Sequence, residues 1–173
     1  MAALFASSVR ALSAGCFAVA AVLYPILMAV IVFNVILRYG FSIGSIELEE
    51  VQWHIYSAAF LLGLADVFRK DANIRVDFLA RVFSERARGL VDIILLALLA
   101  LPFVGLFAYF AWGYFLTSWE LGEVSPHSSG LPARYLIKFV LFFAFLVLFL
   151  QIVETLASRL KEFRAGGQVQ AGD

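Results

Sequence analysis

Two long stretches of the chain carry no formal charge, and they predict the first elements of the fold. Residues 11–37 and residues 93–119 are both free of Asp, Glu, Lys and Arg. A bilayer core about 30 Å thick is crossed by about 20 helical residues, so both stretches can span it with a tilt. Because lipid offers the backbone no hydrogen-bonding partners, each stretch is predicted to be a transmembrane helix.

Two further spans are predicted from less uniform stretches. Residues 47–68 reach spanning length only when the acidic residues at their start are included. Residues 136–153 contain Lys138 near their beginning, and a lysine there can extend its ammonium group to the interface. The pattern therefore predicts an all-α integral membrane protein with four tilted transmembrane helices. Pro25 lies within the first span and Pro102 within the third, and both predict helix kinks.

The composition agrees with this class and argues against several others. Of the 173 residues, 63% are hydrophobic and 15% are charged, whereas soluble domains carry about 25% charged residues. A formal net charge of zero gives no electrostatic basis for binding nucleic acid. Cys16 is the single cysteine, which excludes an internal disulfide, and two histidines are too few for a Cys/His metal cluster. We therefore expect no cofactor and no metal.

The length accommodates one membrane domain. We expect it to cover residues 1–164, followed by a Gly- and Gln-rich tail, residues 165–173, that is predicted to be disordered. The first apolar stretch is far longer than the 7–15 residues of a signal sequence, so we expect it to be retained.

The connection between the second and third spans, residues 69–88, has a helical pattern of its own. Apolar residues recur there at helical spacing with charged residues between them, which predicts a short amphipathic helix on the membrane surface. A solvated turn with a few buried anchors is the alternative. The apolar positions are Ile74, Phe78, Leu79 and Val82.

The distribution of basic residues predicts the orientation. Ten of the thirteen lie in the N-terminal tail, the connection between the second and third spans, and the C-terminal tail. The positive-inside rule therefore places both termini in the cytoplasm. The three on the opposite side are Arg38, Arg134 and Lys138.

A polar stripe at the start of the second span is the main candidate for chemistry or contact. Glu47, Glu50, His54 and Ser57 share one helix face, and Glu49 adds charge beside them. Carboxylates against hydrocarbon are costly, so this face should meet water, a basic group of the same chain such as that of Arg38, or a partner subunit. A catalytic or proton-relay role is a further alternative. His54 by itself is typical of a hydrogen-bonded structural histidine, because haem ligation normally uses two facing histidines.

The outer connection, residues 118–134, is rich in turn formers and contains Trp119 and Glu123. This composition is compatible with a tight hairpin between two helices. It is equally compatible with a docking surface, because an exposed loop with Trp, charge and proline can recognise a partner.

Several short motifs, spread over most of the chain, resemble one family: the small membrane subunit (DctQ-like, or Q subunit) of tripartite ATP-independent periplasmic (TRAP) transporters. The order and spacing of these motifs on a four-span pattern carry the resemblance. They are Asn34-Val35-Ile36-Leu37-Arg38-Tyr39, Glu49-Glu50, Leu62-Gly63-Leu64-Ala65, Asn73-Ile74-Arg75-Val76-Asp77, Ser118-Trp119, Gly122-Glu123, Ser125, Gly130-Leu131-Pro132 and Lys138.

The resemblance implies an accessory, scaffolding subunit of a sodium-coupled importer of an organic acid in the bacterial inner membrane. Its partners would be a large DctM-like membrane subunit, which carries the transport site, and a periplasmic binding protein. Candidate subunit contacts are Arg38, Glu47, Glu49, Glu50, His54, Trp119 and Glu123. Candidate contacts to phospholipids are Arg69, Lys70, Arg75 and Arg81.

Two other classes of function are compatible with the residues alone. A self-sufficient small homodimeric transporter would need an essential buried acid, whereas the acids here cluster at the ends of the spans. A haem- or quinone-binding membrane subunit would give a coloured protein that depends on His54.

Overall fold

The computed structural model describes residues 2–70 and 85–169, and within these ranges every regular element is helical. Four helical stretches are long and apolar enough to cross a membrane, which confirms the predicted fold class. The amphipathic helix predicted between the second and third spans lies largely outside the described residues. The elements are α1 (Ala2–Gly40), α2 (Ile46–Arg69), α4 (Glu85–Leu95), the π-helical segment η1 (Leu96–Ala100), α5 (Leu101–Glu120) and α6 (Tyr135–Val169).

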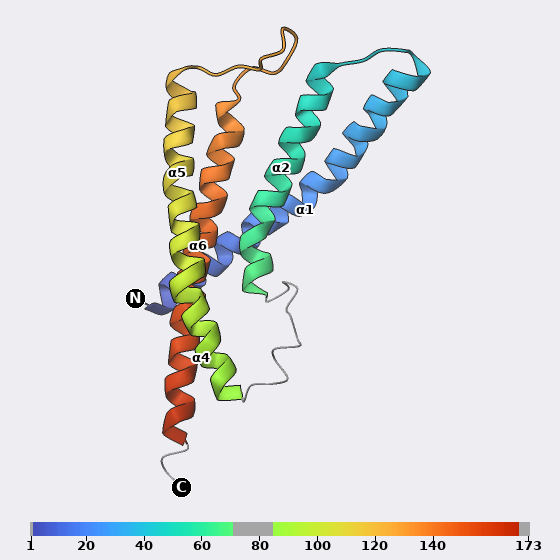
Figure 1. Cartoon of the computed structure of the whole chain (residues 1–173). Helices are drawn as coiled ribbons and strands as arrows, with labels where there is room; N and C mark the ends of the chain where they lie inside the picture. The colour runs from blue at the N-terminus through green and yellow to red at the C-terminus, as the bar shows by residue number, and fades with distance from the viewer. Residues whose placement is uncertain (1, 71–84, 170–173) are drawn as a thin grey trace.

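The helices form two antiparallel hairpins, α1–α2 and α5–α6 (Figure 1). α6 joins the hairpins, because it contacts α2 along one side and α1 where that helix crosses behind it. Both chain ends lie toward one end of the bundle, here called the terminal end (Figure 1). The connections 41–45 and 121–134 lie at the opposite end, here called the loop end (Figure 1).

The helices extend beyond the stretches from which the spans were predicted. α1 begins at Ala2 rather than near residue 11, and the helical stretch of the third span begins at Arg86 rather than at residue 93. α6 continues to Val169 and so enters the segment predicted to be a tail. The reason is that charge-free runs mark the part of a helix in hydrocarbon, whereas the hydrogen-bond ladder continues into the interface.

The third span is bent at η1, as the proline in its sequence predicts. The backbone N–H of Leu101 donates to the carbonyl of Leu96, five residues back instead of four. Pro102 has no N–H, and its ring cannot pack against the carbonyl four residues earlier, so a widened turn accommodates it. α4 and α5 consequently meet at an angle (Figure 1).

A ladder of aromatic pairs holds α5 against α6. The ring centroids lie 4.8–5.3 Å apart in the pairs Phe107–Phe145, Trp112–Phe142, Phe115–Phe139 and Trp119–Tyr135. Buried Ala108, Ala111 and Ala144 let the two backbones approach closely beside these rings. A small buried core of Cys16, Ala65 and Val147 lies where α1, α2 and α6 meet.

A chain of polar side chains, here called the α1–α6 lock, joins α1 to α6 toward the terminal end. Ser13 donates to Gln151 over 2.9 Å, and the amide nitrogen of Gln151 donates to Glu154 over 2.9 Å. The guanidinium of Arg10 donates to the other carboxylate oxygen of Glu154 over 2.5 Å. Ser13, Gln151 and Glu154 are all buried, so their mutual bonds replace those that water would otherwise provide.

We predict that Glu154→Ala lowers the stability of the purified chain by about 1–3 kcal/mol, because buried Gln151 loses its acceptor and Arg10 its counterion. Thermal unfolding in detergent measures this change. Glu162→Ala, on the exposed face of the same helix, is the matched control and should leave the midpoint unchanged. Equal midpoints for the two variants would contradict a stabilising role for the lock.

Candidate partner-docking surfaces

At the loop end, Glu50 fastens α2 to the connection between α5 and α6. The Ser125 hydroxyl donates to one oxygen of its carboxylate, and the backbone N–H of Leu131 donates to the other over 2.7 Å. The two hairpins are thereby linked through residues far apart in the sequence. This set of bonds is called the Glu50 clamp below.

Glycine at position 130 makes the Glu50 clamp possible. A Cβ added there would overlap the side chain of Ser125 and lie 2.9 Å from Oε1 of Glu50, closer than real Cβ contacts. The backbone N–H of Gly130 also donates to the carbonyl of His127 over 3.0 Å, closing a turn beside the clamp. The Gly130-Leu131-Pro132 motif therefore has a steric function here.

A second carboxylate, that of Glu123, holds the same connection to α5 and α6. The Lys138 ammonium and the Ser118 hydroxyl both donate to Oε2 of Glu123, the latter over 2.6 Å. Lys138 also lies 3.8 Å from the centre of the Tyr114 ring, a cation–π contact. The Lys138 hydrogen bond, followed by the Ser118 bond, lowers the pKa of Glu123 below its ordinary value. Lys138 is thus buried inside the protein, where it neutralises an acid.

The connection between α5 and α6 is therefore held at two points, and it presents an apolar surface. α5 ends at Glu120, and Gly122 adopts a positive φ of 57°, the usual way for a chain to leave a helix. Leu121, the residue that caps α5, is 75% exposed, and Trp119 and Val124 on either side of this turn are exposed as well. We call these three residues the loop surface.

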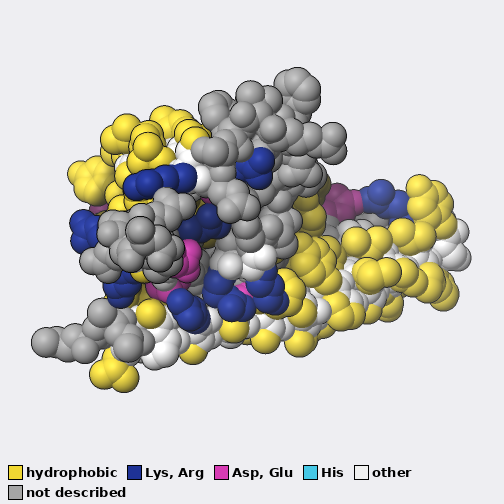
Figure 2. All heavy atoms as spheres, turned by 90° about the horizontal axis from the view of Figure 1, so that it is seen from below, with side chains coloured by type: hydrophobic (Ala, Val, Ile, Leu, Met, Phe, Trp, Pro, Cys, Tyr) yellow, Lys and Arg dark blue, Asp and Glu magenta, His cyan; other side chains and the backbone are white. Residues whose placement is uncertain are grey.

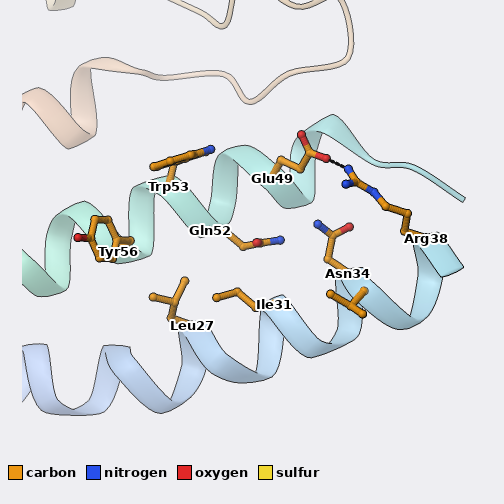
Figure 3. Close-up of a pocket in the computed structure, with 9 residues that line it drawn as sticks. Leu27, Ile31, Asn34, Arg38, Glu49, Gln52, Trp53 and Tyr56 are labelled. Atoms are coloured by element: carbon orange, nitrogen blue, oxygen red, sulfur yellow. Dashed lines mark hydrogen bonds and ion pairs between the residues drawn. The ribbon is translucent and has the colours of Figure 1, made fainter.

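An open groove of about 660 Å³ lies between α1 and α2 near the loop end (Figure 3). Its walls are apolar side chains of both helices, including Leu27 and Ile31, with Trp53 at its edge. The ion pair Arg38–Glu49 lies at one end of the groove (Figure 3). We call this feature the α1–α2 groove.

Of the polar stripe, His54 and Glu50 line one small pocket at the loop end, together with Glu49, His127 and Arg134. Glu47 accepts a hydrogen bond from Ser45, the residue that caps α2. The Nδ1 atom of His54 lies 2.7 Å from the carbonyl of Glu50 in its own helix. The three acids of this region therefore have different roles within the chain. Glu47 binds the residue that caps α2, Glu49 pairs with Arg38 beside the groove, and Glu50 forms the Glu50 clamp.

The terminal end is basic, with acidic side chains among the cations (Figure 2). Buried Asp66 binds Arg69 over 2.5 Å and Lys70 over 2.7 Å, and Asp92 binds Arg159 over 3.1 Å. Two of the candidate lipid contacts, Arg69 and Lys70, are therefore also structural. The other two candidates, Arg75 and Arg81, lie outside the described residues.

One family model matches the chain over residues 27–162, which is most of its length: tripartite ATP-independent periplasmic transporters, DctQ component. The chain belongs to the DctQ family. No curated protein matches it. The matched range includes the Glu50 clamp, the ion pair of Glu123 with Lys138, the loop surface and the α1–α2 groove. DctQ proteins are transporter components rather than enzymes, and with four apolar helices this one is a multi-pass protein of the inner membrane.

Sequence reasoning did not find the α1–α6 lock of this DctQ chain, nor the pairing of Lys138 with Glu123. Both had a signal: Gln151, Glu154 and Lys138 are polar residues in or beside an otherwise apolar span. Such residues usually face the inside of a bundle and bind one another. The partners could not be read from the sequence, because they come from distant helices.

We predict that Gly130→Ala breaks the Glu50 clamp, because the added methyl group displaces Ser125. The connection should then be cleaved by trypsin after Arg134 at least several-fold faster than in the wild-type protein, as followed by limited proteolysis. Gly44→Ala, in the other connection at this end, has open space for its methyl group and is the control. Equal cleavage rates in the two variants would show that the clamp does not hold the loop.

We also predict a pH dependence from Glu123. Its pKa in the folded chain lies below the ordinary 4.5, so its ion pair stabilises the protein above that value. The stabilisation is lost as the pH falls through the lower, folded-state pKa. Thermal unfolding of wild type and Glu123→Gln should therefore differ at neutral pH and converge in acid. A difference that grows with acidity would contradict the sign.

Proposed function

We propose that this chain is the accessory, scaffolding subunit of a sodium-coupled TRAP transporter that imports an organic acid. Its partners are a large DctM-like permease subunit and a periplasmic substrate-binding protein. The DctQ match supports a role within a TRAP transporter. Several acidic side chains bind other groups of the same chain, and this supports an accessory role rather than independent transport.

The state of the buried carboxylates carries this proposal. Among the described residues the buried acids are Asp66 and Glu154, and both bind cations of the same chain. The carboxylate of Glu50 accepts a hydrogen bond from the backbone of the connection between α5 and α6, and that of Glu123 forms an ion pair with Lys138. An ion or substrate site inside a transporter needs polar groups free to bind the cargo, and these carboxylates are committed to holding helices together.

We further propose that the loop surface faces the periplasm and docks the binding protein. Leu121 and Val124 are exposed on a segment that two sets of hydrogen bonds hold in place. Because the segment is already ordered, binding a partner costs little conformational entropy, and this favours recognition. The excess of basic residues at the terminal end supports the matching orientation, with that end in the cytoplasm and near anionic phospholipids.

Uptake into reconstituted vesicles tests the accessory role. Radiolabelled organic acid, a sodium gradient and three protein sets are compared: this chain alone, the large subunit with its binding protein, and all three together. The proposal expects sodium-dependent uptake from the full set and none from this chain alone. Uptake by this chain alone, or full uptake without it, would contradict the proposal.

We predict that Leu121→Asp raises the concentration of binding protein needed for half-maximal uptake by about tenfold, because it places a charge in an apolar contact. The association of the two membrane subunits should not change. Ser128→Asp adds the same charge at another exposed position of the connection and is the matched control. Equal effects of the two variants would point to charge rather than to a contact at Leu121.

A further inference from the structure

The α1–α2 groove is lined by two amide side chains, each with one buried atom that has no hydrogen-bond partner among the described residues. Asn34 on α1 is 7% exposed, and its Oδ1 atom has no hydrogen-bond partner among the described residues. The Nε2 atom of Gln52 on α2 is buried and is equally without a partner there. The two side chains point toward one another across the groove (Figure 3).

The position of these groups makes their lack of partners costly. Both helices are long and apolar enough to span the membrane, and the groove between them is lined mainly by apolar side chains. Hydrocarbon cannot hydrogen-bond, and a buried amide without a partner loses the bonds that it makes to water. An occupant that offers a donor to Asn34 and an acceptor to Gln52 removes this cost.

A lipid acyl chain does not fit these requirements, because it has neither donor nor acceptor. A head-group phosphate is disfavoured, because it brings a negative charge with no free cation to meet it among the described residues that line the groove. Arg38, at one end of the groove, is neutralised by Glu49. A serine or threonine hydroxyl meets both requirements, because it donates one hydrogen bond and accepts others. Transmembrane helices use such hydroxyls, together with small residues, where they pack closely.

We propose that the α1–α2 groove seats one transmembrane helix of the large permease subunit. A hydroxyl or carboxamide side chain of that helix donates to Oδ1 of Asn34 and accepts from Nε2 of Gln52. Apolar residues of the helix fill the space beside Leu27 and Ile31, under the edge formed by Trp53. This inference rests on the proposed function, and it specifies the contact surface for one of the two partners.

Photocrosslinking in the assembled membrane complex tests which molecule fills the groove. A benzophenone amino acid replaces Trp53 at the groove or Phe110 on α5, two aromatic residues that are both 68% exposed. We expect an adduct with the large subunit from position 53 at several times the yield from position 110. Equal yields, no adduct, or an adduct from position 53 with lipid or with a second copy of this chain would overturn the proposal.

Co-purification separates this inference from the proposed function. If the large subunit does not co-purify with the wild-type chain, both fail. If it co-purifies but position 53 gives no adduct with it, the groove is not its seat, and the accessory role stands.

Removing the amide gives a second, independent test. Asn34→Leu eliminates an unpaired buried group, so the isolated chain should unfold at the same or a higher temperature. Retention of the large subunit should weaken by roughly 3- to 15-fold, the range of single interhelical hydrogen bonds in membranes. Val32→Leu, at a position of α1 that is 57% exposed and does not line the groove, is the control and should retain the large subunit normally. Wild-type retention by Asn34→Leu would overturn the proposal, whatever its stability.

Discussion

Inside a bilayer a buried polar group has no water to bind, and this constraint determines how the four helices are held together. Apolar side chains gain little by leaving lipid for protein, so they do not drive the helices to associate. Close contact between small residues such as Ala108 and Ala144, and hydrogen bonds between polar ones, must do so instead. The α1–α6 lock and the Glu50 clamp are these bonds, one toward each end of the bundle.

The same constraint distinguishes internal structure from surfaces that await a partner. Where a polar side chain is buried and paired, as in Glu154 or Asp66, its bonds hold this chain together. Where it is buried and unpaired, as in Asn34, the missing bond indicates a surface that another molecule completes. The proposed accessory role needs both kinds of site, because such a subunit must have a rigid fold of its own and a contact face that assembly completes.

Much of this arrangement could be predicted from the sequence, because length and charge-free runs are properties of single segments. Residues 11–37 and 93–119 had to be spans for reasons of bilayer thickness and backbone hydrogen bonding alone. The pairing of Arg10 with Glu154 could not be predicted, since it depends on two helices meeting at one depth. The acidic stripe was recognised as a face, but its division among a cap, an ion pair and a clamp depends on loop geometry. The unpaired amide atoms of Asn34 and Gln52 can be recognised only in the structure, because a missing partner is apparent only when all neighbouring side chains are known.

The α1–α6 lock also bears on how the chain is made. A ribosome delivers α1 first, and Arg10 and Ser13 then enter the membrane region before their partners on α6 have been synthesised. Glu50 likewise waits for the connection that follows α5. The first hairpin therefore cannot complete its polar contacts until translation is nearly finished. A product that stops before the connection after α5 retains both an unmatched arginine and an unmatched glutamate.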